Sequence, residues 1–350
     1  MKYIIAVDKF KGCLSSIEVN ESVVAGIKRA NPHAETICFP VSDGGEGLVS
    51  AFRKVCPDYI DTSVHVTGPR WEMNEVLAHY IISPDGKTAV MEMSSACGLD
   101  LLTEDLRDPE KTTSYGFGEM LVDAIKRGVE HILTGIGGTA TCDCGQGILH
   151  ALEDNGISYS MLKQICKISV ACDVQNPLFG INGAAYIFAP QKGADELAVR
   201  RLDTFLKDMY IESGCKDSVP GDGAAGGAGF CLRYFLGAEL KSGIDVVLDA
   251  LNFDEHIQSA DLIITGEGKS DIQTLMGKLP MGILQRCRKY RKPVLLIAGS
   301  IDAHYELMRE GFTDLLCINR NDHRPLKILM QPNVAKQNIE NEIQSYCSRS

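Results

Sequence analysis

No apolar run in this 350-residue sequence approaches the roughly 18 residues that a membrane-spanning helix needs. The N-terminus also lacks the apolar core and cleavage site of a secretory signal, because Met-Lys-Tyr-Ile-Ile-Ala-Val-Asp gives way at once to polar residues, as in a strand. The 13 cysteines are scattered, and only Cys142 and Cys144 lie close together. These features predict a cytoplasmic protein whose cysteines are reduced, small core residues.

Positive charge is also scarce. The formal net charge is −11 and the isoelectric point is about 5.3, and no run of Lys and Arg could supply the basic stripe of a duplex-binding protein. We therefore expect neither a nucleic-acid partner nor a membrane partner. No Cys/His spacing matches a zinc site, and no G-x-S-x-G elbow of a Ser-His-Asp hydrolase is present.

What the sequence does contain is a series of short hydrophobic runs separated by helical patterns. Their lack of alternation is typical of strands buried on both faces. The expected strands are Tyr3–Val7, Thr36–Val41, His131–Thr134, Leu262–Thr265, Pro293–Ala298 and Asp314–Ile318. The expected helices between them include Ser16–Arg29, Gly116–Arg127 and Ile283–Tyr290. Strands alternating with helices predict a parallel α/β sheet, and the length predicts about two domains.

Two segments interrupt this alternation. Residues 64–93 have the pattern of a β-meander with turns at Gly68-Pro69 and Pro84-Asp85-Gly86, and 167–193 adds further strands. We therefore predict a Rossmann-like domain of residues 1–63, 114–160 and 250–350. A second, mixed α/β domain of residues 64–113 and 161–249 would be inserted in it, with the active site in the cleft between them.

Glycine-rich segments are the first candidates for ligand binding. The segment from Gly135 to Ala140 fits G-x-G-x-x-A directly after a strand, where glycines let a backbone approach phosphate closely. It is equally compatible with a tight turn that binds nothing. The segment from Gly221 to Gly227 fits G-x-G-x-x-G without a preceding strand, so either an anion site at a helix start or close helix packing would explain it.

The segment Gly266-Glu267-Gly268-Lys269-Ser270 resembles a P-loop only superficially. The first glycine of G-x-x-x-x-G-K-[ST] would have to stand at 263, which is Ile263, and Gly277-Lys278 is followed by Leu279. This spacing excludes the phosphate loop of the P-loop NTPases.

Charged residues follow several of the expected strands. Ligands of open α/β sheets bind beyond the carboxyl ends of the strands, so a shared site is predicted there. The residues concerned are Asp8, Lys9, Lys11, Asp43, Glu46, Asp173, Glu267, Lys269 and Asp271. Each alone could be a helix cap or a solvated turn. Together they suit phosphoryl transfer, which needs cations for the phosphate oxygens, carboxylates for Mg²⁺ and a group that takes the hydroxyl proton.

An ordered series of motifs resembles the type 1 glycerate kinase family over residues 3 to about 300. The matching segments are 8–15, Ser42-Asp43-Gly44-Gly45-Glu46-Gly47, Gly116–Glu119, Gly135–Thr141, 171–178, Pro190–Ala194, Gly223–Gly227, Thr265–Gly268, Asp271, Gln273-Thr274 and Gly277-Lys278. The resemblance implies two α/β domains, one inserted in the other. It also implies phosphorylation of D-glycerate by ATP with Mg²⁺, to 2-phosphoglycerate or else 3-phosphoglycerate, in glyoxylate or glucarate breakdown. We favour the 2-phosphate, in a monomer or homodimer.

The resemblance also implies roles for individual residues. Asp43, Asp173, Asp271 and Lys11 are expected to be catalytic, with Asp43 and Asp271 as the metal ligands. Substrate binding is expected of Lys11, Asn176, Gln273 and Lys278. Nucleotide binding is expected of Gly135, Gly137, Gly138, Thr139, Gly223, Gly226, Gly227, Gly266 and Gly268.

The sequence departs from this family at a few positions. The family commonly has Ser at Lys9, Asn at Cys142, Gly at Cys144, Arg at Lys269 and a small residue at Asp222. Lys for Arg removes a bidentate contact to phosphate, and Asp222 would repel a nearby phosphate unless a cation lay between them.

Two other functions are compatible with the residues: an NAD(P)-linked hydroxy-acid oxidoreductase using the Gly135 loop, and an inactive sugar-acid-binding regulator.

Overall fold

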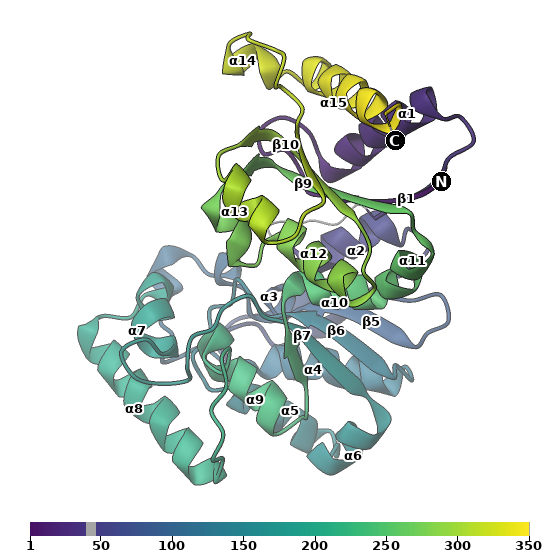
Figure 1. Cartoon of the computed structure of the whole chain (residues 1–350). Helices are drawn as coiled ribbons and strands as arrows, with labels where there is room; N and C mark the ends of the chain where they lie inside the picture. The colour runs from purple at the N-terminus through teal and green to yellow at the C-terminus, as the bar shows by residue number, and fades with distance from the viewer. Residues whose placement is uncertain (40–46, 350) are drawn as a thin grey trace. The chain divides into compact units, whose positions relative to one another are not determined.

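The computed structural model describes residues 1–39 and 47–349, and the chain divides into two compact units (Figure 1). Unit 1 is Met1–Glu46 with Val247–Ser350, and unit 2 is Gly47–Val246. Each unit has a sheet of its own, so the predicted α/β fold with a second α/β domain inserted in the first is confirmed. No helix in the described part of the chain is long and apolar enough to cross a membrane.

Unit 1 contains a five-stranded, fully parallel sheet in the order β11-β10-β9-β1-β2. Its strands are β1 (Lys2–Val7), β2 (Glu35–Cys38), β9 (Leu262–Ser270), β10 (Val294–Ile301) and β11 (Asp314–Cys317). Its helices are α1 (Ser16–Ala30), α11 (Phe253–Ser259), α12 (Leu279–Lys289), α13 (His304–Arg309), α14 (Leu326–Leu329) and α15 (Pro332–Cys347), with the 3₁₀ helix η5 (Ile272–Met276) after β9.

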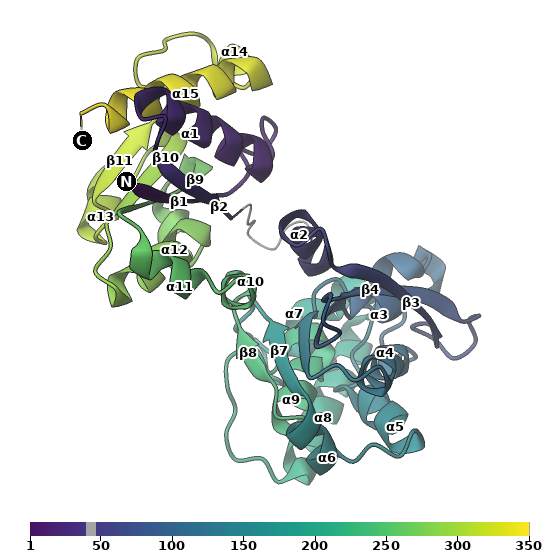
Figure 2. The ribbon, with the colours of Figure 1, turned by 90° about the vertical axis from the view of Figure 1, so that its right-hand side faces the viewer.

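Helices cover the five-stranded sheet because its strands are apolar on both faces. Alternate residues of β1, including Tyr3 and Ile5, share a core with the apolar stripe of α1 and with α15. Helices α1 and α15 lie side by side in both views (Figure 2). At the start of α1, Ser15 and Glu18 form a reciprocal capping box, which fixes where the helix begins after the β1 loop.

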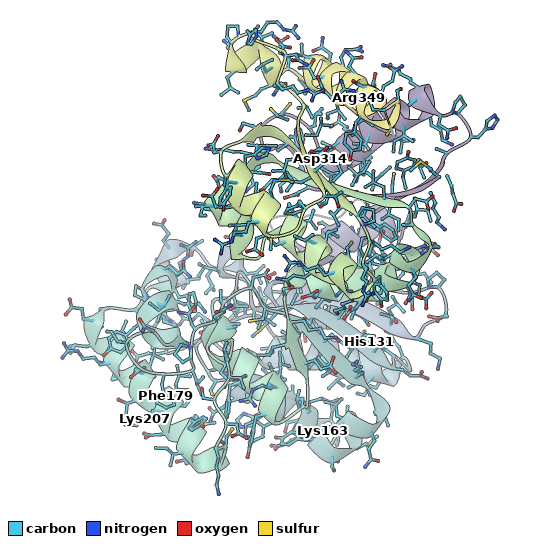
Figure 3. The ribbon with its side chains drawn as sticks, viewed as in Figure 1. His131, Lys163, Phe179, Lys207, Asp314 and Arg349 are labelled. Carbon is cyan, nitrogen blue, oxygen red and sulfur yellow. The ribbon has the colours of Figure 1, made fainter. Side chains whose placement is uncertain are left out.

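Unit 2 contains a six-stranded mixed sheet in the order β3-β4-β5-β6-β7-β8. Its strands are β3 (Ile60–Val66), β4 (Val76–Ile82), β5 (Thr88–Glu92), β6 (His131–Gly135), β7 (Lys167–Ala171) and β8 (Glu239–Lys241). The first three are antiparallel, which confirms the predicted meander, and the last four run parallel. Between β6 and β7, Nε2 of His131 lies 3.0 Å from Oγ of Ser169 (Figure 3).

The helices of unit 2 pack into two cores. They are α2 (Leu48–Val55), α3 (Ser94–Cys97), α4 (Tyr115–Lys126), α5 (Gln146–Asp154), α6 (Tyr159–Ile165), α7 (Ala184–Phe188), α8 (Glu196–Ser213) and α9 (Ala228–Tyr234), and α10 (Gly243–Ala250) leads back to unit 1. The main core joins α4, α5 and α9 to the sheet, and a smaller one joins α7, α8 and α9 around Leu206 and Phe230.

The predicted domain boundaries differ from the observed ones. Residues 114–160 were expected in the Rossmann-like domain, but β6 is hydrogen-bonded between β5 and β7 of the six-stranded sheet. Residues 47–63 likewise belong to unit 2. A short apolar strand such as β6 suits either sheet, because its sequence shows that it is buried on both faces but not which neighbours it pairs with.

Candidate active site

The first cluster of predicted site residues lies where β1 and β9 of unit 1 end. Val7 pairs with Gly266, and the amide of Asp8 donates to the carbonyl of Gly266 at 2.9 Å. Phe10 and Leu14 then close a tight loop through reciprocal backbone hydrogen bonds, and Lys11 lies exposed on this loop. The loop therefore runs beside β9 where that strand passes Gly266.

Strand β9 is longer than predicted. It was expected to end at Thr265, leaving Gly266 and Gly268 in a phosphate-binding loop, but it continues to Ser270 and pairs with β10 as far as Ile301. A Cβ on Gly266 would lie 1.9 Å from the carbonyl oxygen of Ile297, and one on Gly268 would lie 3.2 Å from Cα of Phe10. Close strand packing therefore accounts for both glycines, and their expected role in nucleotide binding stays a prediction.

Glu267 organises the polar groups that follow β9. It is buried, and it accepts a hydrogen bond of 2.5 Å from Thr274 Oγ1 and one of 3.4 Å from Ser270 Oγ. Its other oxygen lies 3.3 Å from Nζ of Lys278, a predicted substrate-binding residue. Burial of a carboxylate is costly unless it is paired, so this network holds both Glu267 and Lys278 in place.

Asp271 is the N-cap of η5. Its Oδ1 accepts from the amide of Gln273 at 2.9 Å, while its own amide donates to Thr274 Oγ1 at 3.0 Å. Oδ2 lies 3.9 Å from Nζ of Lys269, whose nearer partner is Asp302 at 2.8 Å. Oδ1 of Asp271 thus fixes the turn that carries Gln273, and Oδ2 approaches the ammonium group of Lys269.

The second cluster lies in unit 2, around the loop after β6. This loop is attached to the segment 97–99 by two backbone hydrogen bonds, from Leu99 to Gly138 at 2.9 Å and from Ala140 to Cys97 at 2.8 Å. Its tip, Gly137 and Gly138, is exposed. Helix α5 begins only at Gln146, so the loop does not open a helix as a dinucleotide-binding turn does.

Gly137 is an exposed residue of this loop at which the described fold does not require glycine. A Cβ added to it would meet no atom of the described residues within 4 Å, and its backbone is not in the left-handed region, unlike that of Gly138 with φ +72°. Neither packing nor conformation therefore requires glycine at 137. Close approach of a ligand to the backbone is a physical reason for a glycine at such a place.

The Gly221–Gly227 segment has a different character, because it is buried. A Cβ on Gly223 would lie 2.2 Å from the carbonyl oxygen of Pro177, and one on Gly226 would lie 2.2 Å from that of Thr141. The φ angles of Gly226 and Gly227 are +67° and +94°. Packing and backbone conformation thus account for these glycines, which leaves their expected nucleotide contacts a prediction.

Asp222 was expected to repel a nearby phosphate unless a cation lay between them, and the structure pairs it with the cation Arg233. It is fully buried, and its carboxylate accepts from Arg233 through Nε at 2.7 Å and Nη2 at 2.9 Å, with a further bond of 2.9 Å from the amide of Val219. This paired, hydrogen-bonded carboxylate stabilises the segment at whose start it lies.

Asp173 follows β7 and is exposed. Its Oδ1 accepts from the amide of Gly243 at 2.8 Å, at the start of α10. Glu92, at the end of β5, similarly accepts from the amide of Leu48 at 3.1 Å, at the start of α2, and burial raises the pKa of its carboxyl group. The chain passes from one unit to the other just before Leu48 and again within α10. At each of these points a carboxylate at or just after the end of a strand of the six-stranded sheet accepts a hydrogen bond from the first residue of a helix.

Asp173→Asn is expected to lower kcat by at least about tenfold while leaving the melting temperature unchanged, because the amide oxygen still accepts from Gly243 but the charge is lost. Asp173→Ala should lower both kcat and stability, the latter by about 1–2 kcal/mol for a charge-assisted hydrogen bond. Paired kinetics and thermal melts measure this. Normal turnover in the Asn variant would restrict Asp173 to holding α10.

The remaining predicted residues are placed as follows. Asn176 uses Nδ2 to donate to the carbonyl of Asn182 at 2.9 Å, and its own carbonyl accepts from Gly223, so it shapes the loop after β7. Asp43 lies outside the described residues. In the part of the chain that is described, no group of three or more His, Cys, Asp or Glu side chains could hold a metal ion.

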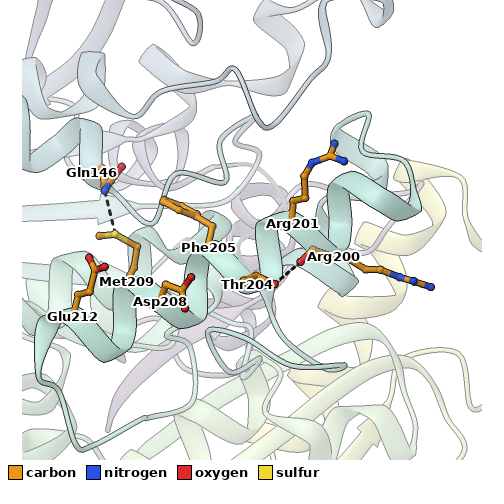
Figure 4. A pocket seen from close by; sticks show the side chains of 8 residues that line it. All are labelled: Gln146, Arg200, Arg201, Thr204, Phe205, Asp208, Met209 and Glu212. Atoms are coloured by element: carbon orange, nitrogen blue, oxygen red, sulfur yellow. Dashed lines mark hydrogen bonds between the residues drawn. The ribbon is translucent and has the colours of Figure 1, made fainter.

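Unit 2 also has two open hollows, of about 660 and 460 Å³, that contain none of the predicted site residues. The larger runs along α8, where Figure 4 shows Phe205, Met209 and Gln146 facing one another. Arg201 lines both hollows, but its guanidinium is engaged by both oxygens of Glu110 at 2.7 Å.

Comparison with known proteins adds a further observation. The model of the glycerate kinase family matches residues 3–162 and 153–348, which is nearly the whole chain. The chain belongs to the glycerate kinase family. The family resemblance noted from the sequence motifs is thereby confirmed, and the chain is identified as a member of a family of phosphotransferases.

Individual relatives in the glycerate kinase family cover most of both chains. The chain is 44% identical over 332 residues to glycerate 2-kinase of Escherichia coli K12, covering 86% of each. It is 41% identical over 372 aligned positions to glycerate kinase of Bacillus cereus, covering 97% of this chain and 95% of that one. The crystal structure of a candidate glycerate kinase 2 from Salmonella typhimurium LT2 superimposes with a TM-score of 0.78 at 36% identity, covering 100% of this chain and 98% of the other.

Two buried charged residues received no role from sequence reasoning. Glu267 was noted only as a charge after a strand, and Lys192 only as part of a family motif. A carboxylate between two glycines of an apolar strand is an unusual pattern, and burial of its charge is what gives it a role. No pattern in the sequence indicated that Lys192 would be buried.

Proposed function

We propose that this chain transfers the γ-phosphate of ATP to the 2-hydroxyl of D-glycerate, giving 2-phosphoglycerate and ADP. Its membership of the glycerate kinase family supports the reaction class, and the name of the Escherichia coli relative supports the 2-position. The structural observation that carries the proposal is the open, exposed backbone at Gly137, which suits a phosphate or carboxylate group.

In this proposal some charged residues at the strand ends neutralise oxyanions and another accepts a proton. Lys11, exposed on its loop, and Lys278, held by Glu267, neutralise phosphate or carboxylate oxygens. One of Asp43, Asp173 and Asp271 takes the proton of the attacking hydroxyl, for which a carboxylate must lie within hydrogen-bond reach of it. The expectation that these groups meet in a cleft between two domains remains a prediction.

The carboxylate of Asp271 suits a magnesium ion, because Mg²⁺ prefers carboxylate oxygens and this side chain, just after β9, is 26% exposed. Mg²⁺ in kinases is held by one or two carboxylates together with substrate phosphates, so Asp271, with Asp43, is a sufficient protein contribution. When bound, the ion would neutralise charge on the phosphate oxygens. Gln273 lies on the turn that Asp271 caps, next to that carboxylate. In this proposal its side chain binds the substrate.

The test is coupled detection of ADP from purified protein with ATP, Mg²⁺ and D-glycerate, with L-glycerate as the control substrate. We expect turnover with D-glycerate, and phosphorus NMR should show the 2-phosphate. A product carrying the 3-phosphate would correct the regiochemistry, and absence of ADP with any hydroxy acid would leave the regulator hypothesis.

The oxidoreductase alternative is weakened by the loop after β6. A dinucleotide pyrophosphate binds at the start of a helix that opens within the glycine motif, whereas α5 begins at Gln146, after ten intervening residues of loop and turn. Addition of NAD(P)H with glyoxylate or hydroxypyruvate should therefore produce no change in absorbance.

A further inference from the structure

Lys192 is a buried lysine beneath the loop that follows β6. It ends the 3₁₀ helix η3 (Pro190–Lys192) and is 4% exposed. Lysine is almost never fully buried unless its charge is paired, since removing an ammonium group from water is costly. A lysine kept in such a place needs a physical reason.

In the described part of the chain, the hydrogen bonds of the Lys192 ammonium group go to one segment. Its Nζ donates to the carbonyl oxygen of Thr141 at 2.7 Å and approaches Thr139 Oγ1 at 3.5 Å. Among residues 1–39 and 47–349, no carboxylate lies within 4.0 Å of this nitrogen. Burial accordingly lowers the pKa of the Lys192 ammonium group, and the nearby Cys142 and Asp143 oppose that shift.

Asp143 does not serve as a salt-bridge partner because it is already engaged. Its carboxylate accepts from the amide and hydroxyl of Ser114, both at 2.7 Å, and from the amides of Gly145 at 3.1 Å and Gly147 at 3.2 Å. Asp143 therefore anchors the chain just after Thr141, and Lys192 anchors it at Thr139 and Thr141.

The two sides of the loop after β6 differ sharply. On the buried side, Thr139 and Thr141 are 4% and 0% exposed, and Oγ1 of Thr141 has no hydrogen-bond partner among the residues that the structure describes. On the open side, Gly137 and Gly138 are exposed, and a Cβ on Gly137 would meet nothing. The ammonium group thus binds the loop through its buried residues Thr139 and Thr141, while Gly137 and Gly138 remain exposed.

The backbone that carries Lys192 is itself constrained. Gly193 follows with φ +101°, and a Cβ there would lie 2.1 Å from the carbonyl oxygen of Arg107. The amides of Lys192 and Gly193 donate to Ala189 and Pro190 at 3.0 Å each. These contacts constrain the Pro-Gln-Lys-Gly turn, and from it the lysine side chain reaches the carbonyl of Thr141.

We propose that Lys192 is a positioning residue, whose ammonium group fixes the Gly135–Thr141 loop in the conformation that binds an oxyanion. The ligand chemistry is a phosphate group of the nucleotide or the carboxylate of glycerate. This inference rests on the proposed function. Lys192 contacts neither ligand, and it acts through the backbone of Thr141 and the hydroxyl of Thr139.

The experiment compares Lys192→Met with Lys192→Arg and with the control Lys207→Met, which replaces an exposed lysine of α8 (Figure 3). ATP and D-glycerate are titrated separately by calorimetry, and KM and kcat are measured for each. We expect Lys192→Met to weaken binding of one of the two ligands at least about tenfold, with a smaller fall in kcat. Lys192→Arg should recover part of that affinity, and Lys207→Met should behave as wild type.

A loss for ATP alone assigns the loop to a phosphate, and a loss for glycerate alone assigns it to the carboxylate. Unchanged affinity for both ligands in a folded Lys192→Met protein overturns the inference, as does an equal loss for both that merely follows a fallen melting temperature. If the Met variant does not fold, Thr139→Val replaces it, with at least a threefold loss for one ligand expected and no loss for either as the contrary result.

The calorimetric titrations keep this inference separate from the proposed function. They report ligand binding whether or not phosphate is transferred. A wild-type protein that binds ATP but forms no ADP with D-glycerate would refute the proposed reaction, while the comparison of Lys192→Met with wild type would still decide the role of the lysine.

Discussion

Asp271→Asn is expected to lower kcat by about 10²–10⁴-fold with little change in stability. The factor is that of a lost general base, or of a lost charge beside the transferring phosphate. Stability should persist because Asn is as good an N-cap as Asp, and its amide oxygen can still accept from Gln273. Steady-state kinetics with ATP and D-glycerate, together with thermal melts, measure the two effects.

Asp261→Asn is the matched control, at the opposite end of the same strand. The carboxylate of Asp261 accepts from the amide of Lys2 at 2.7 Å, and an Asn oxygen can do the same. This variant should retain wild-type kcat and stability. If Asp271→Asn also turned over normally, Asp271 would be a cap for η5 and the base would have to be sought at Asp43 or Asp173.

Much of the fold was predictable because hydrophobic periodicity determines which residues are buried. The helix expected at Ser16–Arg29 is found at Ser16–Ala30, and the strand expected at His131–Thr134 is found at His131–Gly135. The pairing of β6 was not predictable, because a strand buried on both faces carries no mark of its neighbours. The continuation of β9 through Gly266 was missed because glycines in a strand resemble a loop.

At position 144 this chain has cysteine where the family commonly has glycine, and the structure shows how the cysteine is accommodated. The family resemblance indicated that Gly is common there, and the structure has Cys144 in the left-handed region with φ +54°. A non-glycine residue in that conformation costs about 1 kcal/mol. The side chain of Cys144 is buried in the core of α7, α8 and α9, and that burial offsets the strain.

The candidate site was predictable only in part, since sequence patterns locate glycines and charges but not what surrounds them. Asp8 and Lys11 do lie beside Gly266 and Gly268, because β1 and β9 are neighbours. Glu267 and Lys192 owe their importance to burial, which depends on contacts with residues distant in the sequence. A motif alone could not distinguish the open glycine at 137 from the packed glycine at 266.

Gly266→Ala and Gly137→Ala should therefore differ in their effect on the free energy of unfolding. At 266 the methyl group would lie 1.9 Å from the carbonyl oxygen of Ile297, in a strand paired with β1 on one side and β10 on the other. Neither neighbour can move without breaking the ladder, so we expect a loss of about 3 kcal/mol or more, or no folded protein. At 137 the methyl group meets nothing, so stability should be unchanged or higher by about 0.4–1 kcal/mol.

At 137 the expected loss is one of activity and not of stability. If the backbone at 137 approaches an oxyanion, the added methyl group should lower kcat/KM by at least about tenfold in a fully folded protein. Chemical denaturation and steady-state kinetics on both variants measure the contrast. A stable Gly266→Ala protein would contradict the strand geometry, and a fully active Gly137→Ala protein would contradict the proposed approach of a ligand to the backbone at 137.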